Sequence, residues 1–103
     1  MLPPRDPEGY LRDLDAWDES VARMLASEEG LELTEAHWEL IHVIRGFYRS
    51  YEVSPVMRVL VKHVRERLGE EKGNSIYLLT LFPGSPAKRL AKVAGLPRPT
   101  HCL

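Results

Sequence analysis

The sequence predicts a mostly α-helical fold, a single-domain helical bundle followed by an extended C-terminal arm. Apolar residues recur at helical spacing between capping residues and glycines along most of the chain. The chain has 103 residues, 44% of them hydrophobic, which suffices for one core but not for two domains. The last eight residues contain two prolines, which exclude a helix there and favour a polyproline-like conformation.

We therefore divide the chain into a helical domain over residues 1–95 and a flexible arm over residues 96–103. At roughly 3 Å per residue, such an arm could reach on the order of 20–25 Å. Only Leu96 and Leu103 give it appreciable apolar surface, and two leucines do not offset the entropy of ordering a whole segment. We expect few contacts between the arm and the bundle.

The first elements are an extended N-terminal segment and two helices. Pro7-Glu8-Gly9 predicts a turn, after which Tyr10 and Leu11 form a short extended piece. A first helix is expected from about Asp18 to Glu29, where Gly30 ends it. A second follows the N-cap Thr34 and covers residues 35–51. The wide apolar face of this second helix predicts that it is the central helix of the bundle.

Three further helices complete the domain. Ser54-Pro55 predicts a helix start, with a hydroxyl cap before proline at the first helical position, and Gly69 is the expected stop. A short helix is predicted from Ser75 to about Leu81. Ser85-Pro86 repeats the start signal for the last helix, which Gly95 ends.

The candidate for chemistry is Cys102, the single cysteine, which cannot form a disulfide within the chain. Reactive thiols need exposure and an electropositive setting. Its neighbours His101, Arg98 and Lys92 would favour the thiolate, which is the nucleophilic form. A terminal residue without function is the alternative explanation.

No metal site is expected from the histidines. His37 and His42 stand five residues apart on different faces of the second helix, and we place both on or near its surface. No apolar run approaches the length of a membrane span, and the N-terminus lacks a hydrophobic signal core. We therefore expect a cytoplasmic protein without contact to a membrane.

A second function class remains open. The second and third helices resemble a helix-turn-helix in outline, with a row of basic residues (Arg58, Lys62 and Arg65) that could contact phosphates. A solvated helix face balanced by nearby glutamates also explains that row. The formal net charge of −1 favours protein partners, because chains that grip phosphates normally carry a basic excess.

Longer motifs point to a family. The segments HWELIHVIRGFY, SPVMRVLVK and GEEKGNSIYLLTLFPGSPAKRLAKVAGLPRPTHCL resemble the DsrC/TusE family over nearly the whole chain from about Pro7 onward. The resemblance implies a helical bundle, a small N-terminal β-hairpin that is truncated or absent here, and a flexible arm. The penultimate cysteine of the family falls on Cys102.

The resemblance also implies a function. Members that act with sulfite reductase carry a second cysteine at a position that falls on Ala91 here, so the tRNA-thiolation branch is favoured. There the terminal thiol accepts persulfide sulfur from a TusBCD-type complex and passes it to an MnmA-type tRNA thiouridylase for wobble 2-thiouridine synthesis. The protein would be a sulfurtransferase without a cofactor, in contact with tRNA only indirectly. A sulfur carrier linked to sulfite reductase or sulfur oxidation is the alternative.

Overall fold

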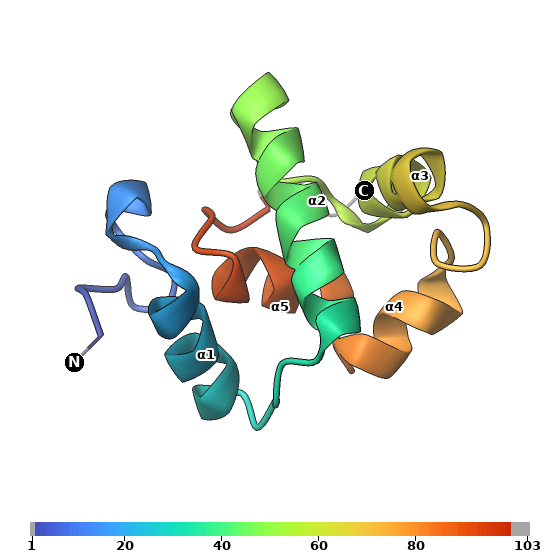
Figure 1. The fold of residues 1–103 in the computed structure, drawn as a ribbon. Coiled ribbons are helices and arrows are strands. Elements are labelled where there is room, and N and C mark those ends of the chain that lie inside the picture. The colour runs from blue at the N-terminus through green and yellow to red at the C-terminus, as the bar shows by residue number, and fades with distance from the viewer. Residues whose placement is uncertain (1, 100–103) are drawn as a thin grey trace.

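The computed structural model describes residues 2–99 and confirms the mostly helical fold class (Figure 1). The described part of the chain contains one short 3-10 helix and five α-helices. Their bounds are η1 (Leu14–Ala16), α1 (Glu19–Glu28), α2 (Glu35–Tyr51), α3 (Met57–Leu68), α4 (Ser75–Leu81) and α5 (Pro86–Val93). The helices of residues 2–99 are too short or too polar to cross a membrane.

Side-chain capping hydrogen bonds mark the starts of α1 and α4. The Asp18 carboxylate accepts a hydrogen bond from the backbone N–H of Val21 at 2.8 Å, and the Asn74 side chain accepts one from Tyr77 at 2.8 Å. Each interaction satisfies a donor that the first turn of a helix leaves unpaired. Short-range signals of this kind explain why the predicted bounds of α2 and α4 agree with the structure.

The centre of the bundle differs from the expectation. Helix α5 packs against each of the other four helices, whereas we expected α2 to be central. In Figure 1, α5 lies behind α2, with α1 on one side and α3 and α4 on the other. The small side chains of Ala87 and Ala91 let neighbouring helices approach α5 closely, while Leu90 is 1% exposed within the core.

The predicted start of the third helix is also wrong. Helix α3 begins at Met57, and its N-cap is Val56. Ser54 does not cap the helix, because its hydroxyl donates to the carbonyl of Pro97, far along the sequence. Ser54 and Pro55 are buried as part of the α2–α3 connection.

His37 is buried and not a surface residue as expected. Its Nδ1 accepts a hydrogen bond from the N–H of Thr34 at 3.1 Å, and its Nε2 lies 2.9 Å from the carbonyl oxygen of Leu81. An imidazole whose Nδ1 accepts must carry its proton on Nε2 when neutral, so Nε2 donates to Leu81. His37 thereby joins the start of α2 to the end of α4, whereas His42 is exposed as predicted.

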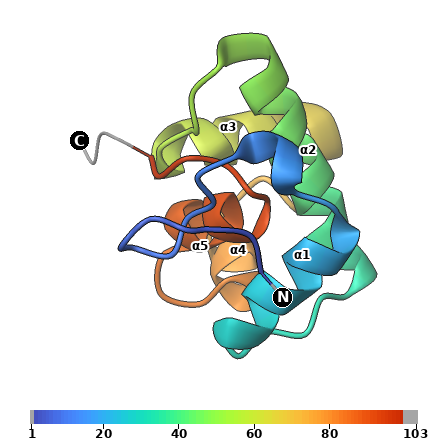
Figure 2. The ribbon, with the colours of Figure 1, turned by 90° about the vertical axis from the view of Figure 1, so that its left-hand side faces the viewer.

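The N-terminal segment forms the predicted turn but no strand within the described residues. Gly9 donates to the carbonyl of Asp6 at 2.9 Å and closes the turn. A single antiparallel bridge pairs Arg5 with Leu11. Tyr10 is 4% exposed, and its hydroxyl donates to the carbonyl of Lys88 at 3.3 Å. This loop therefore packs on α5, beside the point where the chain leaves the bundle (Figure 2).

Candidate functional site

Two of the predicted site residues, Cys102 and His101, lie outside the described residues. The structure does show the base of the arm, residues 96–99, and the end of α5 from which it departs. In residues 2–99 no group of three or more His, Cys, Asp and Glu side chains is placed to hold a metal ion.

Gly95 sets the direction in which the chain leaves α5. Its φ of +74° is a left-handed conformation that favours glycine. Leu96 N–H donates to the carbonyl of Ala91 at 2.9 Å, and Gly95 N–H donates to that of Lys92 at 3.1 Å, which together form a Schellman ending. A Cβ at Gly95 would lie 2.3 Å from Cδ1 of Trp17, so no larger residue fits.

Trp17 and Arg45 hold the last carbonyls of α5. Trp17 Nε1 donates to Val93 at 2.9 Å, and the Arg45 guanidinium donates to Ala94 at 2.6 Å. The guanidinium carbon lies 3.8 Å from the Trp17 ring centroid, a cation–π contact. Burial, followed by the charge of Arg49, lowers the pKa of Arg45, but a guanidinium keeps its proton in proteins. The cation thus lies at the negative end of the α5 dipole.

The first half of the arm packs on the bundle. Leu96 is 2% exposed in the core, and Pro99 is buried. Ser54 donates to the Pro97 carbonyl, and Arg98 Nη1 lies 3.1 Å from Oε1 of Glu8. Figure 2 shows these residues running between the N-terminal loop and the α2–α3 connection. The expectation of few contacts is wrong for residues 96–99, while residues 100–103 lie outside the described part.

The anchored base shortens the reach of the thiol. Cys102 is the third residue after Pro99, and an extended chain spans at most about 10 Å over three residues. The estimate of 20–25 Å for the whole arm assumed that it was free from Leu96 onward. If Cys102 transfers sulfur, its partner must approach the surface around Glu8 and Ser54 closely.

The two described cations of the predicted site are engaged in separate ion pairs. Lys92 Nζ lies 3.9 Å from Oε2 of Glu29 and 5.2 Å from the Tyr10 ring centroid. Arg98 pairs with Glu8. Burial raises the pKa of Tyr10, and the charge of Glu8 adds to this effect. The structure therefore places both cations around the arm's base but gives neither a role at the thiol.

Sequence reasoning missed three residues of this site, namely Trp17, Arg45 and Ser54. Trp17 stands outside any predicted helix, and Arg45 interrupts the apolar pattern of α2. An arginine within an apolar helix face was a usable signal, because such a charge needs a buried partner. The partner itself could not be identified, because it is a backbone carbonyl 49 residues away.

Known proteins resemble the chain along almost its whole length. The family model described as DsrC like protein matches residues 3–103. The sulfurtransferase TusE of Pectobacterium atrosepticum is 51% identical over 98 residues, which cover 95% of this chain and 90% of that protein.

Two solved structures share the fold. The NMR structure of Allochromatium vinosum DsrC gives a TM-score of 0.86 at 50% identity, covering 95% of this chain and 88% of that one. The oxidized gamma-subunit of the dissimilatory sulfite reductase (DsrC) of Archaeoglobus fulgidus gives 0.83 at 40% identity, covering 98% and 92%.

Three relatives that match 95% of this chain, from Pectobacterium atrosepticum, Sodalis glossinidius and Photorhabdus laumondii, are named as sulfurtransferases. Sulfur transfer is accordingly the activity class of this protein. The family match over residues 3–103 and the close identity to these relatives together establish that the chain belongs to the DsrC-like family.

Proposed function

We propose that the protein is a cytoplasmic relay that accepts persulfide sulfur on Cys102 and passes it to a tRNA thiouridylase. A TusBCD-type complex would be the donor and an MnmA-type enzyme the acceptor, which uses the sulfur for wobble 2-thiouridine. The observation that carries this proposal is the position of the single cysteine, three residues beyond the anchored Pro99. A reducing compartment keeps such a lone thiol available.

The relay consists of two sulfur exchanges that balance without an external oxidant. The Cys102 thiolate attacks the outer sulfur of the donor's cysteine persulfide. The donor's S–S bond breaks, the donor cysteine leaves as a thiolate, and Cys102 carries the persulfide. An acceptor thiolate then attacks the outer sulfur on Cys102, and the Cys102 thiolate leaves. With one cysteine in the chain, no second thiol of the same molecule can attack the persulfide.

The anchored base supports this chemistry because it limits the conformational freedom of the segment that precedes Cys102. Ser54 and Arg98 fix the segment that precedes the last residues, so little chain entropy remains to be lost when a partner binds them. We assign to His101, Arg98 and Lys92 the role of favouring the thiolate through their positive charge. In this proposal tRNA meets the relay only through the thiouridylase.

A sulfur carrier linked to sulfite reductase or sulfur oxidation is the second candidate, favoured by the 40% identity to the A. fulgidus gamma-subunit. Against it stands Ala91, where the resemblance places a second cysteine in members that serve the reductase. The Ala91 side chain is 0% exposed, and its carbonyl accepts the hydrogen bond that ends α5. This position has a packing role in this chain and offers no thiol.

Nucleic-acid binding through α3 is the candidate from another class. Within the basic row, Arg65 already forms a hydrogen bond inside the chain, because its Nε donates to the Gly73 carbonyl at 3.1 Å. Arg58 and Lys62 therefore remain as the test residues.

The decisive experiment compares Cys102→Ser with Arg58→Ala/Lys62→Ala. Incubation with a persulfide-charged TusBCD-type complex should add one sulfur mass to the wild-type chain and none to Cys102→Ser. In cells that depend on the gene, thiolated uridine should disappear with Cys102→Ser and persist with the double variant. Sulfur retained by Cys102→Ser would overturn the relay. Loss of thiolation with the double variant alone would favour nucleic-acid binding.

A further inference from the structure

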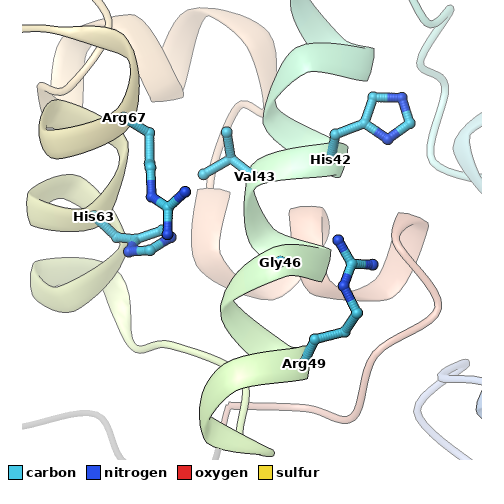
Figure 3. A pocket seen from close by; sticks show the side chains of 6 residues that line it. All are labelled: His42, Val43, Gly46, Arg49, His63 and Arg67. Carbon is cyan, nitrogen blue, oxygen red and sulfur yellow. The ribbon is translucent and has the colours of Figure 1, made fainter.

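A groove between α2 and α3 carries positive charge that the described part of the chain does not neutralise. Its volume is about 340 Å³, and its lining consists of His42, Val43, Gly46, Arg49, His63 and Arg67. Figure 3 shows His63 and Arg67 reaching from α3 toward Val43, with His42 and Arg49 on α2 above and below Gly46. The lining contains two guanidinium groups and two imidazoles but no carboxylate.

The two arginines of this groove lack acidic partners. The ion pairs formed within residues 2–99 engage other cations, and none involves Arg49 or Arg67. Burial lowers the pKa of His63, and the charge of Arg67 lowers it further, while Glu66 acts in the opposite direction. A bound anion near Arg67 would relieve the repulsion between this guanidinium and a charged His63 imidazole.

Gly46 gives a second, independent indication. A glycine inside a long helix is destabilising relative to alanine. Here no packing requires it, since a Cβ at Gly46 would meet only Nη2 of Arg49, at 3.8 Å. The residue leaves the backbone of α2 open at the floor of the groove. Open space over a helix backbone, flanked by arginines, suits the close approach of another chain.

The character of the neighbouring surface decides which kind of chain fits. His63 also lines an adjoining groove with Phe47, Tyr51, Val59, Lys62 and Glu66. The Phe47 ring centroid lies 5.0 Å from that of His63, and Tyr51 is 61% exposed. A nucleic-acid backbone that extended from the arginines into this adjoining groove would meet the Glu66 carboxylate and apolar side chains. A peptide with a carboxylate followed by an apolar residue would meet complementary groups at both places.

We propose that this groove docks a carboxylate-bearing segment of the protein that exchanges sulfur with Cys102. This inference rests on the proposed relay and adds the surface by which the relay recognises its partner. Arg49 lies one helical turn after Arg45, which holds the Ala94 carbonyl at the start of the arm. A partner seated on the groove therefore lies beside the arm's base, which the short reach of the thiol requires.

The test measures binding and sulfur transfer separately. Dissociation constants are determined for a purified TusBCD-type complex, an MnmA-type thiouridylase and tRNA, at low and high salt. We expect Arg49→Glu/Arg67→Glu to weaken binding of at least one protein partner by tenfold or more. Arg23→Glu/Arg58→Glu carries the same change of charge outside the groove and should change that binding by less than about twofold. Gly46→Leu fills the groove without changing the charge and should also weaken binding.

The outcomes separate this inference from the relay itself. Circular dichroism establishes that each variant is folded, and transfer from a small-molecule persulfide establishes that Cys102 still accepts sulfur. If the groove variants bind both proteins as tightly as the wild type while Cys102 accepts sulfur, the docking groove is refuted and the relay stands. If they lose affinity for tRNA alone, the groove is a nucleic-acid site. If the groove variants lose affinity for a protein partner while their Cys102 still accepts sulfur from the small molecule, both ideas are supported.

Discussion

The base of the arm and the α2–α3 groove each contain a glycine and an arginine. The surroundings of the first pair, Gly95 and Arg45, differ from those of the second pair, Gly46 and Arg49. At the base, Gly95 has a positive φ and lies against the Trp17 ring, and Arg45 donates a hydrogen bond to the Ala94 carbonyl. In the groove, Gly46 has open space and Arg49 has no acidic partner within the described chain. The first pair stabilises the fold, whereas Gly46 lowers the stability of α2 and Arg49 adds little to it, which fits the docking role proposed for the groove.

The largest expected effect is that of Gly95→Ala. A left-handed conformation costs a non-glycine residue about 1–2 kcal/mol, and the clash with Trp17 adds about 1–3 kcal/mol. We expect a loss of about 3 kcal/mol in the free energy of unfolding, measured by urea denaturation. Gly30→Ala is the matched control, because Gly30 ends α1 with φ +73° but has nothing within 4 Å of a Cβ. Equal losses for the two variants would contradict the role given to Trp17.

The two arginines provide the next comparison. Arg45→Met keeps most of the apolar stem but leaves the Ala94 carbonyl without its charged donor, so it should lower the free energy of unfolding by about 2 kcal/mol. Arg49→Met removes an exposed charge and should change it by less than about 0.5 kcal/mol. Thermal and urea unfolding of both variants check this. A large loss for Arg49→Met would show that the groove has a structural purpose.

Gly46→Ala should have the opposite sign to Gly95→Ala. Alanine is a better helix former, and the new Cβ meets no close neighbour, so the free energy of unfolding should rise by about 0.5–1 kcal/mol. Urea midpoints of the two variants, measured under identical conditions, give the comparison. A destabilised Gly46→Ala would mean that the glycine serves the fold, and the argument for a ligand at this position would fail.

The smallest expected effect is a pH dependence from His63. Its pKa in the folded state is below the usual value of 6.5, because burial and Arg67 disfavour the charged imidazole while Glu66 acts in the other direction. The unfolded chain therefore binds the proton more readily, and His63 lowers stability as the pH falls from about 7 to about 5. Unfolding experiments across this range should show a shallower slope for His63→Gln, and a partly reduced slope for Arg67→Gln. A steeper slope in either variant would contradict this account.

The sequence by itself determined most of the helices. Periodicity, the cap Thr34 and the stop at Gly69 act over one or two turns, so they can be recognised without knowing the rest of the fold. The family motifs also identified Cys102 as the candidate thiol, although the residues around it stay a prediction. What these signals share is that the interacting groups are close together in the sequence.

Only the tertiary structure decided how those helices meet and where the arm is held. Ser54-Pro55 carries the same local signal as Ser85-Pro86, yet Ser54 lies outside α3 and donates to Pro97, while Ser85 stands at the N-cap position of α5 without a side-chain capping hydrogen bond. His37 is buried with its Nε2–H donating a hydrogen bond to the Leu81 carbonyl, and α5 is central because small residues allow four helices to approach it. The two hydrogen bonds join residues 43 and 44 positions apart, and α5 contacts helices from four different parts of the chain. A local pattern contains no information about which distant backbone carbonyl or helix will be adjacent.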